Sequence, residues 1–301
     1  MKKVFVFHEV YNLSIFEKTI SFLSKKYEFK NLSEFINSDR DDICHITFDD
    51  GHHTFTKAYE ILKKNNIPST LFISIDKILN EKNFWFQDIE YLNLKLKDRL
   101  LLNFCDFFSI SYDNQFKLFD YLKLLKIDEI HAFINETKNR YQIKVPNFNI
   151  SPKDLEKLSK DCLLELGSHT VNHPILLNEK NNLSEIEIKD SIDNLNNFLN
   201  KKVVSFAYPN GIKQLDYSER EKNILKNNGI KYAFTMNLHN FNENKFDHLE
   251  IPRISFANNF FKNLILFYIP EIYNKLSKTD IPFIKKSEIV RRFKLKKSFN
   301  M

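Results

Sequence analysis

The sequence has few cysteines and glycines, and it lacks long apolar runs. Its 301 residues include three Cys and four Gly. Cys44, Cys105 and Cys162 form no CxxC pair and are odd in number, which argues against a disulfide framework and a thiolate zinc site. No stretch approaches the roughly 18 consecutive apolar residues of a membrane-spanning helix. We therefore expect a soluble protein of a reducing compartment.

The first ten residues, MKKVFVFHEV, also lack the apolar core of a secretory signal. A run of only four apolar residues precedes His8, whereas a signal peptide needs roughly 7 to 15. We interpret this stretch as a first strand. The expected location is the cytoplasm.

Charge is distributed unevenly along a chain of otherwise ordinary globular composition. Hydrophobic residues make up 43% and charged residues 28%, which excludes disordered, collagen-like and coiled-coil proteins. Residues 262–301 hold ten Lys or Arg against three Asp or Glu, a local +7 within a net +6. Together with the apolar residues 260–272, this basic tail predicts peripheral contact with an anionic membrane. The main body has no zinc finger, RNA-recognition signature or basic helix, so we expect no nucleic-acid partner.

Short β-branched and aromatic runs alternate with amphipathic helical patterns along the chain. Candidate strands are residues 4–7, 43–48, 70–75, 163–166, 203–208, 231–235 and 249–254. Helical patterns cover residues 14–26, 55–65, 184–199 and 218–227. The alternation predicts βαβ units with parallel strands, and we favour a barrel over an open doubly wound sheet. In either fold the active site lies at the carboxyl ends of the strands.

Residues 81–150 interrupt this alternation, because they show helical periodicity and no clear strand. We interpret them as a helical insertion within a catalytic domain of residues 1–261, which the tail of residues 262–301 follows. The insertion contains the only tryptophan, Trp85. This residue is either part of the insertion's aromatic core or a surface on which a sugar stacks.

The motif TFDDG, residues 47–51, follows the second predicted strand. Adjacent carboxylates such as Asp49 and Asp50 raise the pKa of one of the pair unless a cation neutralises them, so we expect a metal ion or a shared proton. Gly51 can supply the turn that aims neighbouring side chains at one centre. The next residues, His52 and His53, are interpreted as partly exposed loop residues.

The motif SHTVNHP, residues 168–174, follows the fourth predicted strand and places His169 four residues before His173. Pro174 biases His173 away from helical geometry, which indicates a loop. Two neutral imidazoles and one carboxylate leave coordination positions open for water and substrate, as catalytic metal sites do.

A third motif, FAYPNG, covers residues 206–211 and also ends a predicted strand. Its Pro and Gly predict a tight turn that exposes a backbone N–H, a donor suited to an oxyanion. Each motif alone is also typical of an ordinary turn or loop. All three follow predicted strands in order, and that coincidence favours one shared site.

These three motifs resemble the first three motifs of the polysaccharide deacetylase family, also called carbohydrate esterase family 4 or the NodB-homology domain. The resemblance covers residues 1–255, apart from the insertion. It implies a distorted (β/α) barrel, a divalent metal ion and hydrolysis of an N-acetyl group on a sugar. The metal is most often Zn²⁺, with Co²⁺, Ni²⁺, Fe²⁺ and Mn²⁺ as alternatives.

The resemblance also implies roles for individual residues, assigned by position in the motifs. The metal ligands are Asp50, His169 and His173. Asp49 is the general base, which takes a proton from a water whose pKa the metal lowers to about 7. The backbone amide near Asn210 faces the oxyanion, and the expected substrate contacts are Tyr208, Pro209 and Trp85.

The sequence departs from the common family pattern at two positions. No Leu-x-His motif follows the last strand, but FHEV at residues 7–10 is similar to a Tyr-His-x-Val motif in relatives that deacetylate biofilm polysaccharides. That similarity makes His8 the candidate general acid. Many members carry an arginine where Ala207 stands here. Arg253, in a Pro-Arg motif similar to that of the same relatives, is the residue expected to pair with Asp49.

The expected substrate is a nucleotide- or lipid-linked N-acetylated sugar from surface polysaccharide or glycolipid synthesis. This expectation depends on the missing signal peptide and on family analogy. The same site would also suit a deformylase or another small-acyl amide hydrolase. An iron oxygenase with two His and one carboxylate, and a non-catalytic sugar-binding module, are further alternatives. The sugar, the acyl group and the oligomeric state stay open.

Overall fold

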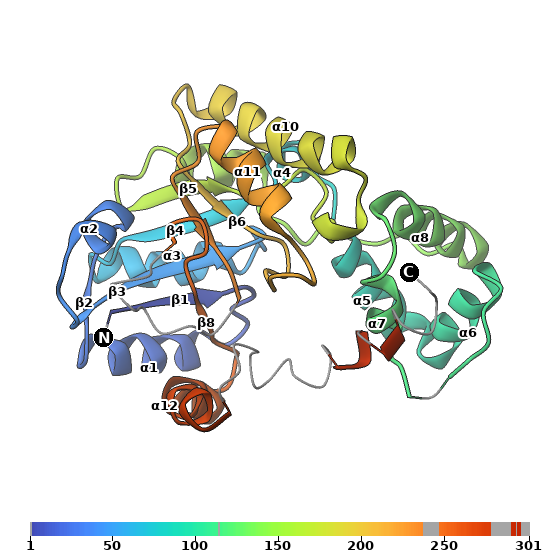
Figure 1. Cartoon of the computed structure of the whole chain (residues 1–301), viewed down its shortest axis with the longest axis horizontal. Helices are drawn as coiled ribbons and strands as arrows, with labels where there is room; N and C mark the ends of the chain where they lie inside the picture. The colour runs from blue at the N-terminus through green and yellow to red at the C-terminus, as the bar shows by residue number, and fades with distance from the viewer. Residues whose placement is uncertain (1, 114, 237–246, 278–289, 293, 296–301) are drawn as a thin grey trace.

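A curled parallel β-sheet forms the centre of the computed structural model (Figure 1), which describes residues 2–113, 115–236, 247–277, 290–292 and 294–295. The strand order is β7-β6-β5-β4-β3-β1-β8, and β2 pairs with β3 beside this path. All strand pairs are parallel. The strands are β1 (Lys3–Phe7), β2 (Glu28–Phe29), β3 (Ile43–Asp49), β4 (Ser69–Ile73), β5 (Leu164–Ser168), β6 (Ser205–Ala207), β7 (Tyr232–Phe234) and β8 (Ile254–Ser255).

The segment that follows β7 connects the two ends of this sheet. Ile251 forms a parallel bridge with Phe234 of β7, and Ile254 then pairs with Phe5 of β1 at the opposite end of the strand order. The sheet therefore closes into the predicted distorted (β/α) barrel. All seven predicted strand regions overlap a strand, although residues 249–254 share only Ile254 with β8, and the sequence pattern missed only the two-residue β2.

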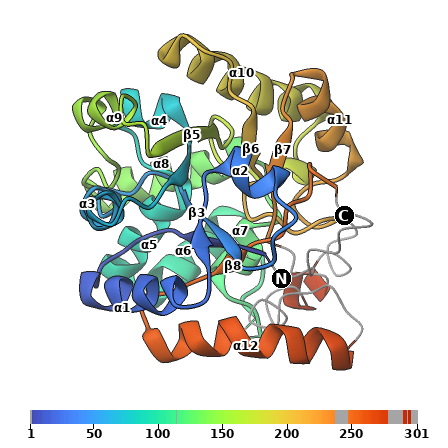
Figure 2. The ribbon, with the colours of Figure 1, turned by 90° about the vertical axis from the view of Figure 1, so that its left-hand side faces the viewer.

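Helices cover the outside of the sheet (Figures 1 and 2). The α-helices are α1 (Leu13–Ser24), α2 (Leu32–Asn37), α3 (Phe55–Lys64), α4 (Ile75–Leu79), α5 (Trp85–Leu96), α6 (Asp98–Phe107), α7 (Leu118–Leu122), α8 (Ile127–Tyr141), α9 (Pro152–Leu158), α10 (Asn181–Leu199), α11 (Glu219–Asn227) and α12 (Phe260–Ser277), and η1 (Leu176–Asn178) is a 3-10 helix. The four predicted helices correspond to α1, α3, α10 and α11. None of the helices in the described residues has both the length and the hydrophobicity of a membrane span.

Local sequence explains why these elements form where they do. The Asn12 side chain accepts a hydrogen bond from the Ile15 N–H and caps α1. Phe16, Ile20 and Leu23 then recur at helical spacing and are all buried. In β3 all seven residues are buried, as expected for a parallel strand covered on both faces.

Helices α5 to α8 lie beside the barrel and have their own hydrophobic core (Figure 1). That core includes Trp85, Phe104 and Phe133, all buried. Leu295, near the end of the chain, is 1% exposed and belongs to the same core. The predicted insertion of residues 81–150 thus contains a packed helical cluster, to which a distant C-terminal residue contributes.

The predicted basic tail lies partly outside the described residues. Helix α12 runs along α1 (Figure 2) and buries Phe267, while Phe261 is 77% exposed. Arg291 and Arg292 form ion pairs with Asp120 and Asp216, so these two cations are engaged within the protein. Five other basic residues of the tail lie outside the described residues: Lys278, Lys285, Lys286, Lys296 and Lys297. Membrane contact through this tail stays a prediction.

Candidate active site

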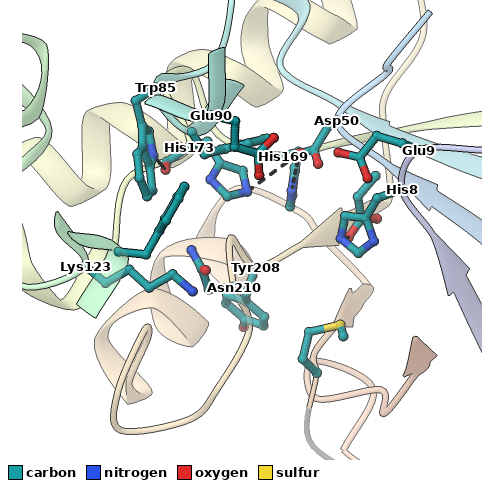
Figure 3. A pocket seen from close by; sticks show the side chains of 14 residues that line it. His8, Glu9, Asp50, Trp85, Glu90, Lys123, His169, His173, Tyr208 and Asn210 are labelled. Atoms are coloured by element: carbon teal, nitrogen blue, oxygen red, sulfur yellow. Dashed lines mark hydrogen bonds and ion pairs between the residues drawn. The ribbon is translucent and has the colours of Figure 1, made fainter. Parts of the chain in front are cut away.

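A cavity of about 330 Å³ lies at the carboxyl ends of the strands (Figure 3). One wall consists of residues at the ends of β1, β3, β5 and β6, and the facing wall comes from α5 and α7. The strand wall carries charged and metal-ligating side chains. The helical wall carries the aromatic side chains of Trp85, Phe86 and Phe119. The helical insertion therefore supplies five of the 14 residues that line the cavity.

Asp50, His169 and His173 form a buried cluster in this cavity. The Asp50 Oδ1 atom lies 3.5 Å from His169 Nε2 and 3.6 Å from His173 Nε2. One ligand atom from each residue lies within 4.8 Å of the other two. Asp50 and Gly51 both have positive φ, 71° and 76°. This left-handed turn ends β3 and brings Asp50 into the same cavity as Asp49.

Neighbouring groups hold the His169 imidazole and the His173 backbone in place. His169 Nδ1 lies 2.7 Å from the Ala207 carbonyl oxygen, and donation to that oxygen leaves Nε2 unprotonated and facing Asp50. The Trp85 indole donates to the His173 carbonyl oxygen at 2.8 Å. Burial lowers the pKa of His173 to about 3. His173 is therefore held in the neutral form that binds metals.

The cluster fits a divalent metal ion. Asp50 Oδ1 and His173 Nδ1 are buried and have no hydrogen-bond partner within the described part of the chain, although such buried polar atoms are usually paired. Burial alone would raise the pKa of Asp50, but the adjacent side chains of His169 and His173 lower it below its usual range. Two imidazole nitrogens and one carboxylate are a donor set of catalytic zinc sites. These three residues are therefore suited to hold the metal.

Glu187 of α10 organises the loop between the two histidines. Its Oε2 accepts hydrogen bonds from the Val171 N–H at 3.1 Å and the Asn172 N–H at 2.8 Å. Its Oε1 accepts from Asn172 Nδ2 at 2.7 Å. Glu187 is 6% exposed, so these bonds lie away from solvent. Sequence reasoning missed this residue because its partners are 15 and 16 positions away.

Glu187→Gln should weaken metal binding. The glutamine amide would place a donor among three donors, so at least one N–H of the His169–His173 loop loses its acceptor. We expect about 10- to 100-fold weaker Zn²⁺ affinity, the usual cost of losing a residue that orients metal ligands. Competition titration with a chelating dye measures this affinity. Glu185→Gln, on the exposed face of the same helix, is the matched control; equal affinities of the two variants would contradict the prediction.

Asp49 and Arg253 form a buried two-point ion pair. Arg253 Nη1 and Nη2 each lie 2.7 Å from a different oxygen of Asp49. The guanidinium sits against Phe72 and Phe234, with its carbon 5.7 and 5.8 Å from the ring centres. Burial alone would raise the pKa of Asp49, but the charge and hydrogen bonds of Arg253 outweigh it and lower that pKa. The structure thus joins the two residues that the sequence predicted to pair, and Asp49 is held ionised.

His8 lies at the mouth of the cavity, one residue beyond β1. Phe7 of β1 pairs with Phe48 of β3, which brings His8 next to Asp49. Its Nε2 is 3.8 Å from Asp49 Oδ2, and its side chain is 35% exposed. His8 therefore has access both to the cavity and to solvent, as a residue that donates protons requires.

The turn of residues 206–211 presents an unpaired N–H beside this cavity. The Tyr208 N–H donates to Phe234 O at 3.0 Å and the Gly211 N–H to Pro209 O at 2.6 Å. Among the described residues, no group accepts from the Asn210 backbone N–H. Gly211 has φ 69°, and a Cβ there would lie 2.8 Å from the Met236 N atom, so this turn requires glycine.

The predicted substrate contacts occupy different positions in this structure. Tyr208 lines the cavity and stacks on Tyr217, with ring centres 3.9 Å apart. Trp85 lines it too, yet it is 1% exposed and belongs to the core of the insertion. Pro209 is buried and is not among the residues that line the cavity. Tyr208 and Trp85 therefore face the cavity, whereas Pro209 shapes the turn behind it.

The interpretation of His52 as a partly exposed loop residue was wrong. His52 is 3% exposed, and its Nδ1 lies 2.8 Å from Thr54 Oγ1. It forms an antiparallel bridge with Asn149, at the end of the insertion, which covers it. His53 is exposed, as expected.

Several cavity residues gave no signal in the sequence, because they come from segments whose position depends on packing. Glu9, Glu90, Lys123 and Met236 all line the cavity. Partial burial and the nearby carboxylates of Glu9 and Asp50 raise the pKa of Glu90 to about 7. The amphipathic periodicity of α5 indicates a buried face, but it does not show which strand ends that face meets.

The sequence profile of the polysaccharide deacetylase family matches residues 97–244. That range includes both histidines of the cluster and the turn of residues 206–211, and it begins after the TFDDG motif. Over these residues the chain is similar to the polysaccharide deacetylase family. The proteins of that family are de-N-acetylases, hydrolases that act on amide bonds.

Solved structures of polysaccharide deacetylases share the fold of this chain. The deacetylase PplD of Streptococcus pyogenes, solved in complex with acetate, is 18% identical, with a TM-score of 0.56 over 93% of this chain and 98% of that one. IcaB from Ammonifex degensii is 15% identical, with a TM-score of 0.59 over 90% and 95%. A de-N-acetylase from Aggregatibacter actinomycetemcomitans is 15% identical, with a TM-score of 0.54 over 87% and 98%. No curated protein matches the chain by sequence.

Proposed function

We propose that this protein removes an N-acetyl group from an amino sugar with the help of a bound divalent metal ion. We propose Zn²⁺ as that ion. One observation carries the proposal: the Asp50–His169–His173 cluster lines the same cavity as Asp49, the carboxylate that pairs with Arg253. We also propose residues 1–261 as the catalytic domain, with residues 81–150 inserted in it and residues 262–301 as a separate tail. The cytoplasmic location stays a prediction.

In this proposal each catalytic residue has a distinct task. When bound, the metal would polarise the amide carbonyl and lower the pKa of a bound water to about 7. Asp49, held ionised by Arg253, accepts the proton of the attacking water. The Asn210 N–H faces the oxyanion that develops on the carbonyl. His8 donates a proton to the leaving amine.

The size and lining of the cavity favour a small sugar substrate. About 330 Å³ is near the lower end of the ~300–1,000 Å³ of ligand pockets, which suits one sugar residue. Phe86 and Phe119 offer aromatic surface on the wall opposite the metal ligands. We propose a nucleotide- or lipid-linked N-acetylated sugar as the substrate class.

Metal content and acetate release, measured together, test the function. The purified protein is assayed on N-acetylglucosamine oligomers, UDP-N-acetyl sugars and lipid-linked analogues, with N-formyl analogues in parallel. One divalent ion per chain and acetate release support the deacetylase. Formate release without acetate would favour the deformylase. No metal would favour a sugar-binding module.

His8→Ala should lower kcat by about 100-fold while the metal is retained, because general acid catalysis contributes roughly 10²–10⁴. Acetate release at saturating substrate measures kcat, and metal analysis confirms the intact site. His53→Ala, an exposed histidine beside the same strand ends, is the control. Full activity of His8→Ala would show that another group protonates the amine.

A further inference from the structure

Arg292, close to the C-terminal end, is a fully buried cation outside the catalytic cluster. It is 0% exposed, and its Nη1 forms an ion pair with Asp216 Oδ1 at 2.8 Å. Its Nη2 donates to the carbonyl oxygens of Lys123 at 3.3 Å and Leu215 at 3.5 Å. One guanidinium thus contacts the end of α7 and the loop that follows β6. A buried arginine is costly unless it is paired in this way.

Asp216 connects Arg292 to the turn that carries Asn210. Its Oδ2 accepts a hydrogen bond from the Ile212 N–H at 2.9 Å, and its own N–H donates to Ile212 O at 2.8 Å. Ile212 directly follows the FAYPNG turn. The residue after Asp216, Tyr217, stacks on Tyr208 of the same turn. The Arg292–Asp216 pair therefore fixes the turn from its C-terminal side.

The same segment also holds the opposite wall of the cavity. Arg291 forms an ion pair with Asp120 of α7, and Leu295 is buried in the core of α5 to α8. In Figure 1 this segment, coloured red, lies beside α7. We call residues 290–292 and 294–295 the C-terminal clasp. Phe119 of α7 and Lys123, directly after α7, line the cavity.

We propose that Arg292 is a positioning residue that sets the spacing between the α7 wall and the Tyr208–Asn210 turn. The inference depends on the proposed function, because the turn presents the Asn210 N–H to the reacting carbonyl. A displacement of about 1 Å in a positioned group can cost up to 10²-fold in rate. Loss of Arg292 therefore acts on kcat more than on KM.

Arg292→Met, which keeps the bulk and removes the charge, is the first test. We expect kcat for acetate release to fall about tenfold or more, with KM changed less than threefold and the metal retained. Lys294→Met, an exposed residue of the same clasp, should keep wild-type kcat. An Arg292→Met enzyme with kcat within twofold of wild type would overturn the proposal.

A second variant separates positioning from stability. Arg292→Met leaves Asp216 as a buried, unpaired carboxylate, and Asp216→Asn in the same chain removes that charge while keeping an acceptor for the Ile212 N–H. We expect the double variant to regain melting temperature but not kcat, since the links to Lys123 and Leu215 are still missing. Recovery of both would assign Arg292 a purely structural role. If Arg292→Met does not fold, Arg292→Lys, which keeps the charge, replaces it in the comparison.

Fluorescence of Trp85, the only tryptophan, gives a readout that needs no activity. Its ring lies 5.9 Å from that of Phe119 on α7, so a loosened wall exposes it. In Arg292→Met and the double variant, acrylamide should quench Trp85 more strongly than in wild type. Unchanged quenching would contradict the proposed link to α7. A wild type that releases no acetate from any substrate would contradict the function alone, because the quenching result still tests the clasp.

Discussion

Asp49→Asn is expected to lower kcat by about 10³-fold while the bound metal stays in place. Asparagine has almost the same shape but cannot accept a proton, and general base catalysis contributes roughly 10²–10⁴. The metal should remain, because the proposed ligands are Asp50, His169 and His173. Acetate release and metal content of the same preparation measure the two effects.

The substitution also affects Arg253, whose two nitrogens each lie 2.7 Å from an Asp49 oxygen. The asparagine amide would face one of these nitrogens as a second donor, so we expect a lower melting temperature as well. Assays are therefore run well below the transition. Asp193→Asn, exposed on α10, is the control for loss of a carboxylate. A kcat within tenfold of wild type would mean that Asp49 is not the base.

His169→Ala should remove the metal and the activity together. The cluster then offers one imidazole and one carboxylate, and the Ala207 carbonyl loses the group that lies 2.7 Å from it. We expect at least 100-fold weaker Zn²⁺ binding. Bound metal stabilises the fold by about 2.7 kcal/mol when free metal is 100 times Kd. Added Zn²⁺ should therefore raise the melting temperature of wild type but not of His169→Ala.

The exposed His248→Ala is the control for the metal experiment. It should bind one ion per chain and respond to Zn²⁺ as wild type does. Retention of a full equivalent of Zn²⁺ in His169→Ala, together with the thermal shift, would show that the metal sits elsewhere. Chelation of wild type followed by re-addition of Zn²⁺, Co²⁺ or Mn²⁺ then compares the metals by activity.

The barrel and the positions of the three motifs were predictable from the sequence because they depend on local pattern. Parallel strands show as short apolar runs, and their carboxyl ends converge in every βαβ fold. Asp49, Asp50, His169 and His173 each follow such a run, so their meeting in one cavity follows from topology. Arg253 was found only through the family resemblance, since no local pattern places it beside a residue 204 positions away.

The helical wall and its supports were not predictable, for a different reason. Trp85 and Phe119 reach the cavity only because α5 to α8 pack against the strand ends, and periodicity does not specify that contact. Arg291 and Arg292 look like part of a basic tail by composition, yet both form ion pairs inside the protein. Composition reports charge, whereas burial depends on the acidic partners that the fold supplies.

Residues 251–255, which connect β7 to β1 and close the barrel, matter for how the proposed catalytic residues come together. Arg253 lies between Ile251, which pairs with β7, and Ile254, which pairs with β1. A chain whose strands have formed up to β7 already has all three metal ligands, but Asp49 still lacks its arginine. In the proposed mechanism, metal binding and activation of the base therefore depend on different contacts. Activation of the base requires the pairing of β8 with β1, two strands at opposite ends of the chain. In the proposed mechanism, a partly unfolded chain that has lost this closure would keep its three candidate metal ligands but not the ion pair that holds the base ionised.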